Sequence, residues 1–379
     1  MTKTLIPVLL LIIVIICITL SGCSAHSQPV IWHASDIHYI APELIEDRLQ
    51  FIQLMENADG KMTHRIDDIA DEFISEALKA GPDCVILSGD LTLNGAKESH
   101  IAFAGKLRAL KEAGIEVLVM PGNHDIRGAA YRFREEGVEG FPAATPEEFR
   151  EIYYDFGYSG ALSTDPSSLS YMYELPGNVR ILVIDTNSSL RGSVSGSTFK
   201  WIEEQLKASE GFDVISVTHQ NLFVHNPMFR FGYQINNADK LEQMLSKYGI
   251  QLNLSGHLHV QHITEENGIA DIAVSSLAVA PNQYGVLKNR TYETRKLNLD
   301  IGADEFFDSC SRRKMKFDDK ELLETAVKLN REYFAGRVSE ADADRAMELS
   351  EGGEGLNRYL STIIAEKGKN YNKFCLPKK

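Results

Sequence analysis

The sequence predicts an α/β protein, layered in the manner of α+β folds, with one large domain and a helical appendage at the C-terminal end. Two observations predict this class. Short β-rich runs alternate with amphipathic helical stretches from Val30 to Ser276, and charged helical stretches follow after about Arg290. Because 44% of the 379 residues are apolar and 24% are charged, the chain can bury a large core.

Seven β-rich runs are expected to form strands. They span residues 30–34, 84–88, 117–120, 180–185, 214–218, 252–255 and 272–275. Two stretches between them keep one apolar face at helical spacing, namely Ile66, Ile69, Phe73, Ile74 and Ala77, and Ile101, Ala104, Leu107 and Leu110. A further helix should begin at the capping-box pattern Thr145-Pro146-Glu147-Glu148 and continue to about Asp155.

The C-terminal part of the chain has a different pattern. After about Arg290 we expect no further strands, and residues 317–334 and 340–364 have the spacing of charged amphipathic helices. We therefore expect a main domain at residues 30–290 and a helical C-terminal region at residues 291–379. Covering a site and mediating assembly are both open roles for this region.

The N-terminus resembles a bacterial lipoprotein signal peptide. Lys3 is followed by an apolar run over residues 5–20, which ends in Leu20-Ser21-Gly22-Cys23. The resemblance implies a signal peptide at residues 1–22, a lipid on Cys23 and a tether over residues 23–29. It implies that the protein lies outside the cytoplasm, anchored by this lipid to the bacterial cell membrane. An uncleaved membrane anchor is the alternative.

The net charge restricts which partners the protein can bind. The formal net charge of −14 argues against a broad surface for long nucleic acid. A small anionic substrate is compatible with this net charge, because bound cations reverse the local potential.

The cysteines are expected to have different roles. Cys84 lies in an apolar run and is expected to be a core thiol. Cys310 and Cys375 either form a disulfide in an oxidising compartment or remain two thiols.

Side chains able to bind metal ions follow the predicted strands where these strands end. They are Asp36, His38, Asp90, Asn123, His219, His257 and His259. Loops at the carboxyl ends of strands meet at one edge of an α/β sheet, so these residues can converge. Carboxylate oxygens and imidazole nitrogens suit two cations held about 3.5–4 Å apart, the arrangement used for displacement at phosphorus. The sequence therefore predicts a hydrolase of phosphate esters.

These residues lie in five motifs whose order resembles that of the calcineurin-like metallophosphoesterase family. The motifs are Asp36-Ile37-His38, Gly89-Asp90, Gly122-Asn123-His124-Asp125, His219 and Gly256-His257-Leu258-His259. The match covers about residues 30–280, and five motifs in order are far more specific than a single one. The resemblance implies a catalytic domain built as a β-sandwich of two mixed sheets flanked by helices, with a dinuclear metal centre.

The resemblance also divides the ligands between two ions that Asp90 would bridge. One ion would be held by Asp36, His38 and His259, and the other by Asn123, His219 and His257. The ions would be Mn, Fe or Zn, among which this set of nitrogen and oxygen ligands does not choose. Water bridged between them would give a hydroxide that attacks phosphorus in line.

Among the remaining polar residues, His124 is the family's candidate proton donor to the leaving alkoxide. Asp125 is expected to orient the His124 ring. His225 either contacts the substrate or supports the metal ligands without binding an ion itself. Structural roles are expected for the histidines that match no motif, which are His33, His64, His100 and His262.

The substrate is suggested by a loop after His219 that contains Phe229, Arg230, Phe231 and Tyr233. Aromatic rings and a guanidinium suit a nucleobase and a phosphate, and a hydrophobic flap would explain the same residues. Residues 89–95 and 121–126 also resemble those of bacterial lipoprotein cyclic nucleotide phosphodiesterases. We therefore expect a phosphodiesterase of cyclic nucleotides or other small phosphodiesters. The alternatives are a phosphomonoesterase or nucleotidase and, in another class, a surface lipoprotein that binds a partner and keeps a structural metal site.

Overall fold

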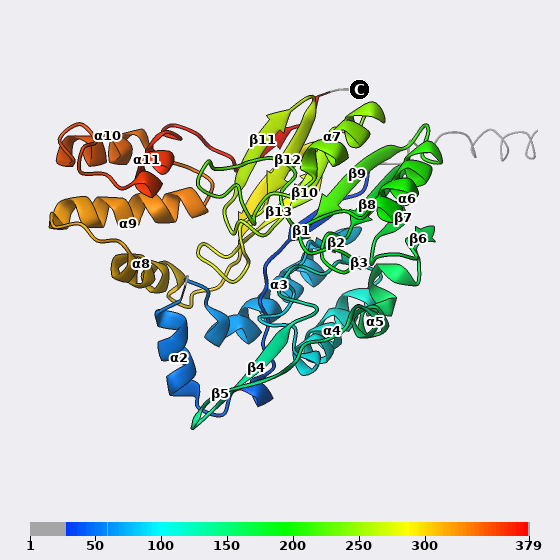
Figure 1. The fold of residues 1–379 in the computed structure, drawn as a ribbon, viewed down its shortest axis with the longest axis horizontal. Coiled ribbons are helices and arrows are strands. Elements are labelled where there is room, and N and C mark those ends of the chain that lie inside the picture. Colours follow the sequence, from blue (N-terminus) through cyan, green and yellow to red (C-terminus); the bar gives the residue numbers. More distant parts are fainter. Residues whose placement is uncertain (1–27, 59, 378–379) are drawn as a thin grey trace, which may run out of the picture.

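The computed structural model describes residues 28–58 and 60–377. The expected signal peptide and the expected lipid site at Cys23 lie outside the described residues. Within those two ranges no helix combines the length and the apolar character needed to cross a bilayer. The described chain forms two stacked β-sheets between helical layers, and a group of helices extends to one side (Figure 1).

The first sheet has six strands in the order β15-β14-β13-β1-β2-β3. Strands β1, β2 and β3 are parallel, whereas β13 pairs antiparallel with β1, β14 with β13, and β15 with β14. The bounds are β1 Ile31–Ala34, β2 Cys84–Leu87, β3 Glu116–Val119, β13 Gln283–Lys288, β14 Thr291–Lys296 and β15 Lys373–Cys375. Every residue of β1 and β2 is buried, as expected for parallel strands covered on both faces.

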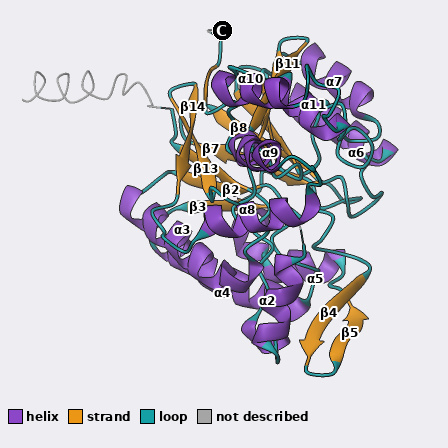
Figure 2. Cartoon of the chain, turned by 90° about the vertical axis from the view of Figure 1, so that its left-hand side faces the viewer, coloured by secondary structure: helices purple, strands orange, loops and turns teal. Residues whose placement is uncertain are grey.

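The second sheet has seven strands in the order β11-β12-β10-β9-β8-β7-β6. Strands β8, β9, β10 and β12 are parallel, and the outer strands are antiparallel. The bounds are β6 Ser163–Thr164, β7 Tyr171–Leu175, β8 Val179–Ile184, β9 Asp213–Thr218, β10 Leu252–Ser255, β11 His262–Glu266 and β12 Ile269–Ala273. A separate hairpin, β4 Ala129–Arg134 and β5 Gly137–Pro142, projects away from both sheets (Figure 2).

The alternation of side chains along the strands explains how the two sheets stack. In β8, Ile181 and Val183 belong to the core shared with the first sheet, whereas Leu182 and Ile184 belong to the core under the outer helices. Successive side chains of a strand point to opposite faces, so β8 contributes to both layers. The Tyr171 hydroxyl also crosses between the sheets and donates to the Val119 carbonyl at 2.8 Å.

Helices cover the outer face of each sheet (Figures 1 and 2). On the side of the first sheet lie α2 Arg48–Glu56, α3 Ile66–Ala80, α4 Lys97–Glu112 and α5 Pro146–Ile152. On the side of the second sheet lie α6 Gly196–Lys207 and α7 Ala238–Lys247. Short helical turns are η1 Pro42–Leu44, η2 Thr63–Arg65 and η3 Tyr154–Tyr158.

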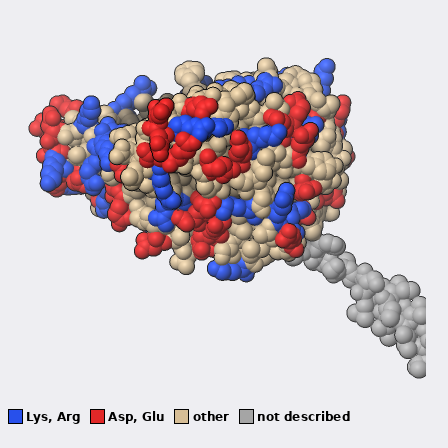
Figure 3. Space-filling model, turned by 90° about the horizontal axis from the view of Figure 1, so that it is seen from below, with Lys and Arg blue, Asp and Glu red and all other residues tan. Residues whose placement is uncertain are grey.

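The C-terminal helices form the projecting part of the molecule. Their bounds are α8 Ala303–Lys314, α9 Lys320–Phe334, α10 Glu340–Leu349 and α11 Arg358–Ile364. Helices α9, α10 and α11 pack around a third apolar core, and we call these three helices the C-terminal bundle. Acidic and basic side chains lie side by side on the bundle (Figure 3), with ion pairs such as Lys328–Asp342 at 2.7 Å.

The structure contains all seven predicted strands, and each predicted end lies within three residues of the observed one. The capping box is present too, since the Thr145 side chain accepts from the Glu148 amide and α5 begins at Pro146. That helix ends at Ile152 rather than near Asp155. Ile101 was wrongly placed on the buried face of α4, because it is 54% exposed while His100 and Phe103 are buried.

The expectation of no strands after Arg290 is wrong. β14 forms a hairpin with β13, and the chain returns after the bundle as β15, so the C-terminal region completes the first sheet. β15 has only three residues, too few for a periodic signal. Among the described cysteines, Cys310 and Cys375 are not bonded to each other, and the Cys310 thiol instead lies 3.3 Å from the Glu56 carbonyl oxygen.

Two fully buried tyrosines test this description of the core. Tyr171→Phe should lower the free energy of unfolding by about 1–2 kcal/mol, because it removes a buried hydrogen bond. Tyr292→Phe should leave it unchanged or raise it, because the buried Tyr292 hydroxyl has no hydrogen-bond partner among the described residues. Urea denaturation measures both, and equal losses for the two variants would contradict this assignment.

Candidate metal centre

The predicted ligands lie at the carboxyl ends of five parallel strands, where the two sheets adjoin. β1, β2 and β3 end before Asp36, Asp90 and Asn123, and β9 and β10 end before His219 and His257. Backbone hydrogen bonds connect these loops, including Asp36 N to Gly89 O at 3.0 Å and Gly256 N to His219 O at 3.0 Å. Residues more than 200 positions apart therefore meet at one edge of the sandwich.

The structure brings the ligand atoms together in two groups that share Asp90. The first group is Asp36, His38, Asp90 and His259, and the second is Asp90, His219 and His257. In each group the candidate ligand atoms all lie within 4.8 Å of one another. Asn123 joins the second group, since its Oδ1 lies 3.1 Å from His219 Nε2. This division matches the two-ion arrangement predicted from the motifs.

Backbone carbonyls select which histidine nitrogens face the centre. His219 Nδ1 lies 2.9 Å from Ser88 O, and His257 Nε2 lies 2.8 Å from Gly232 O. A carbonyl only accepts, so these nitrogens carry the protons and the opposite nitrogens offer lone pairs to the site. In the first group, His38 Nε2 and His259 Nε2 lie 3.1 Å apart and both approach Asp36. Convergent lone pairs of this kind fit a cation.

Electrostatics favour a cation at this place. Asp36 and Asp90 are 0% and 1% exposed. Burial would raise the pKa of Asp90, but His219 and His124 hold it well below its usual range. Burial alone would lower the pKa of His219, yet the Asp90 carboxylate raises it to about 9, so this carboxylate favours a proton on His219 that a bound metal ion would replace. The residues present, with carboxylate, amide and imidazole donors, therefore fit Mn, Fe or Zn ions.

The ligand loops adopt a backbone conformation that is rare for residues with side chains. Asp36, His38, Asp90, His257 and His259 have φ values of 54°, 50°, 48°, 65° and 63°. Such left-handed residues cluster at functional sites, where the surrounding structure holds them. The motif glycines make the close approach possible: a Cβ on Gly122 would lie 2.1 Å from Asp90 Oδ1, and one on Gly256 would lie 1.9 Å from Ser35 Oγ.

His124 lies beside the ligands but in neither group. Its backbone amide donates to Asp90 Oδ1 at 2.8 Å, and its Nδ1 lies 2.8 Å from Leu93 O. Nε2 is left facing the site, 3.9 Å from Asp90 Oδ2, and the side chain is 38% exposed. An imidazole in this position can transfer a proton to a group that reaches the centre from solvent.

The role predicted for Asp125 is wrong, because the Leu93 carbonyl, not Asp125, orients the His124 ring. The Asp125 carboxylate is fully buried and accepts from the Leu91, Thr92 and Gly122 amides and from the Thr92 hydroxyl. It therefore joins the loop after β2 to the loop after β3. Its place directly after His124 suggested a contact that the turn does not make.

Sequence reasoning missed a second buried carboxylate with a similar role. Asp271, in β12, accepts from the Leu222 and Phe223 amides, from the Ser255 hydroxyl and from Asn253 and His225. It holds the loop that follows His219. A single aspartate in the otherwise apolar run Ile269–Ala273 was the available signal. His225 is thus a residue behind the ligands, at 3.1 Å from Asp271.

The histidines outside the motifs have structural partners, as predicted. His33 Nε2 lies 2.8 Å from Ser88 Oγ, and His100 Nε2 lies 2.8 Å from Asp125 O. His262 Nδ1 lies 3.0 Å from His225 Nδ1. The His64 ring lies 4.9 Å from the Phe306 ring, between η2 and α8.

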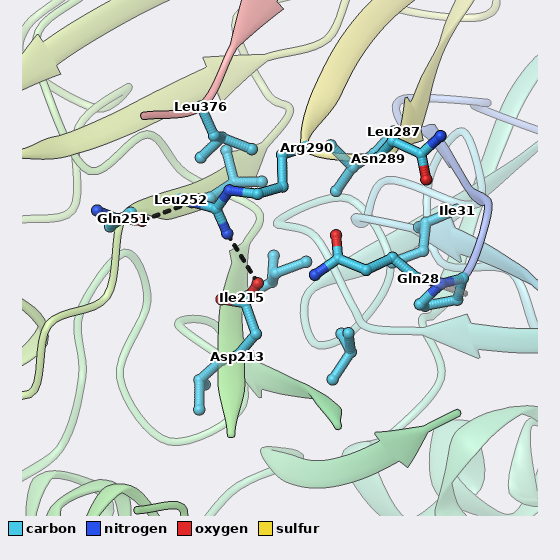
Figure 4. A pocket seen from close by; sticks show the side chains of 13 residues that line it. Gln28, Ile31, Asp213, Ile215, Gln251, Leu252, Leu287, Asn289, Arg290 and Leu376 are labelled. Atoms are coloured by element: carbon cyan, nitrogen blue, oxygen red, sulfur yellow. Dashed lines mark hydrogen bonds and ion pairs between the residues drawn. The ribbon is translucent and has the colours of Figure 1, made fainter. Parts of the chain in front are cut away.

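A small pocket lies at the opposite end of the strands (Figure 4). It is lined by residues at the amino ends of strands, such as Ile31, Asp213 and Leu252, whereas all the ligands follow carboxyl ends. Arg290 crosses it and bonds to Asp213 at 2.9 Å and to Gln251 at 2.6 Å. This pocket is therefore remote from the metal centre, and the Arg290–Asp213 ion pair lies within it.

Comparison with known proteins agrees with this geometry. The family model for calcineurin-like phosphoesterases matches residues 29–261. The crystal structure of a dimetal phosphatase from Danio rerio is 12% identical, with a TM-score of 0.53 over 71% of this chain and 96% of that one. That likeness confirms the predicted fold of two mixed sheets flanked by helices.

Two curated proteins are similar in sequence. A probable glycerophosphodiester phosphodiesterase of Arcobacter nitrofigilis is 28% identical over 52% of this chain and 64% of its own length. An uncharacterised metallophosphoesterase of Bacillus subtilis is 27% identical over 44% of this chain and 41% of its own length. The chain thus spans less than two thirds of either relative.

Asp125→Asn tests the loop-joining role of this carboxylate. We expect the free energy of unfolding to fall by about 2–4 kcal/mol, because the amide nitrogen would face backbone donors that now point at an oxygen. Thermal and urea denaturation measure this loss. Asp155→Asn, at an exposed position, is the control, and equal stability of the two variants would contradict the assignment.

Proposed function

Because the chain belongs to the calcineurin-like phosphoesterase family, we propose that it is a phosphodiesterase acting on cyclic nucleotides or other small phosphodiesters. The observation that carries this proposal is the pair of ligand groups sharing Asp90, with the His124 imidazole beside them. A purely structural metal site has no use for a half-exposed imidazole that is not a ligand. The similarity to a probable glycerophosphodiester phosphodiesterase supports a diester substrate over a monoester.

The chain's own residues would divide the work as follows. Asp36, His38 and His259 would hold one ion, Asn123, His219 and His257 the other, and Asp90 would contact both. Bound there, the ions would supply Lewis acidity toward phosphoryl oxygens and lower the pKa of water. Ser88 O and Gly232 O keep His219 and His257 turned toward the site.

His124 would act on the leaving group. Leu93 O keeps the proton on Nδ1, so Nε2 is the atom that protonates the departing alkoxide when the imidazole is charged. The Phe231 side chain supports a contact with an aromatic base, because it is 93% exposed and adjacent to Gly232, whose carbonyl bonds to His257. The neighbouring Arg230 would suit a phosphate.

The class of ester is tested with two chromogenic substrates. The purified protein loaded with Mn²⁺ should show a higher kcat/KM for bis(p-nitrophenyl) phosphate than for p-nitrophenyl phosphate. Asp90→Ala should abolish both activities, because both ligand groups lose their shared carboxylate. Preference for the monoester would move the assignment to a phosphomonoesterase, and the absence of both activities would favour a binding role.

His124→Ala tests proton donation. With an alkyl leaving group, as in a cyclic nucleotide, kcat should fall by about 10²–10⁴-fold, the usual worth of general acid–base catalysis. With p-nitrophenolate, which departs without a proton, the fall should be much smaller, and metal content should not change. Equal losses on both substrates would argue against this role for His124.

We further propose that Cys23 carries the lipid that anchors the protein on the outer side of the bacterial cell membrane. The apolar run over residues 5–20 followed by Leu20-Ser21-Gly22-Cys23 supports this. Cells grown with labelled palmitate should yield labelled protein in the membrane fraction, and Cys23→Ser should remove the label. Unlabelled wild-type protein would contradict the proposal.

A further inference from the structure

The apolar core of the C-terminal bundle includes residues of the metal centre's own loop. Leu258 and Val260, on either side of the ligand His259, are 5% and 1% exposed and lie in one cluster with residues of α9, α10 and α11. Leu258 therefore stands between His257 and His259 and points into the bundle. The bundle and the last metal loop form one packed unit.

The backbone of this loop needs outside support. His257 and His259 have φ values of 65° and 63°, a conformation that residues with side chains rarely keep unless the surroundings hold it. Local bonds help, such as His257 N to Asp36 Oδ2 at 2.8 Å. The loop is also bonded to the end of α9, since Gln261 N donates to Phe334 O at 3.2 Å. Burial of Leu258 and Val260 in the bundle core therefore restrains the backbone of His257 and His259.

A second connection runs through residues 226–234, which we call the bracing loop. Asn226 Nδ2 donates to Tyr333 Oη at 2.8 Å and to Thr362 Oγ1 at 3.0 Å, so the loop is bonded to α9 and α11. The Phe229 ring lies 5.8 Å from Tyr359 of α11 and 5.0 Å from Tyr233.

The other end of the bracing loop reaches the ligand His257. The Tyr233 ring lies 5.2 Å from the His257 ring, and Gly232 O bonds to His257 Nε2 at 2.8 Å. This carbonyl determines which nitrogen of His257 is a donor and which can be a ligand. Partners that orient a ligating histidine in this way commonly change metal affinity when they are lost.

We propose that the C-terminal bundle positions the ligands His257 and His259, and that Leu258 is a positioning residue for both. Asn226 positions His257 alone, through the bracing loop. This proposal rests on the metal-binding part of the proposed function and not on the identity of the substrate. The bundle is then a part of the catalytic centre rather than an independent appendage.

Mn²⁺ binding to the purified full-length protein, followed by titration calorimetry, tests the proposal. Leu258→Ala should weaken binding of both ions by about tenfold or more, in the range found when partners of metal ligands are removed. Leu258→Met, which retains the apolar volume, should restore affinity. Leu245→Ala is the matched control, because it truncates a fully buried leucine of a different core, in α7. It should lower thermal stability yet leave Mn²⁺ affinity unchanged.

Asn226→Ala keeps the test decisive if Leu258→Ala does not fold. It should weaken binding of the ion held by His257 and leave binding of the other ion unchanged. The reason is that the bracing loop contacts only His257 of the two histidines. Wild-type affinity for both ions in Asn226→Ala and Leu258→Ala, or equal weakening in Leu245→Ala, would overturn the proposal. Normal binding of two ions without hydrolysis of any ester would instead contradict the proposed function and leave this inference intact.

Discussion

Two carboxylates are buried where the sheets adjoin, and the loops of both sheets are arranged around their charge. Asp36 and Asp90 are almost completely excluded from solvent. A buried ionised carboxylate is stable only when positive charge or several donors face it. Backbone amides and the imidazoles of His38, His219 and His259 surround these oxygens. The same arrangement suits two cations, so the loops of both sheets must converge on Asp90.

Each sheet secures its half of the centre with a further buried aspartate. Asp125 joins the loops after β2 and β3, and Asp271 holds the loop after β9. Because these carboxylates collect several donors each, the ligands keep their places without relying on the ions alone. The C-terminal bundle adds support on the side of the second sheet, where Leu258 enters its core. Both halves thus contain a buried aspartate, and the half formed by the second sheet also packs against the bundle.

The sequence identified the metal ligands better than it identified the residues that hold these ligands in place. The ligands could be found because Asp, His and Asn recur after apolar strands in a recognisable order, and the structure brings all seven together. The function of Asp125 was misjudged, since neighbouring residues of a turn need not touch. Asp271 was missed because one aspartate in a buried strand carries no spacing signal. Strand β15 depends on pairing with the distant β14, and the contact of Leu258 with the bundle depends on tertiary packing, which periodicity does not encode.

The arrangement of the ligands fits two metal ions, one on each side of Asp90. Anomalous X-ray diffraction from crystals grown with Mn²⁺ would locate these ions. We expect two anomalous peaks about 3.5–4 Å apart, both in contact with Asp90. One peak should lie beside Asp36, His38 and His259, and the other beside Asn123, His219 and His257. A single peak, or two peaks that do not share Asp90, would contradict a dinuclear centre bridged by this carboxylate.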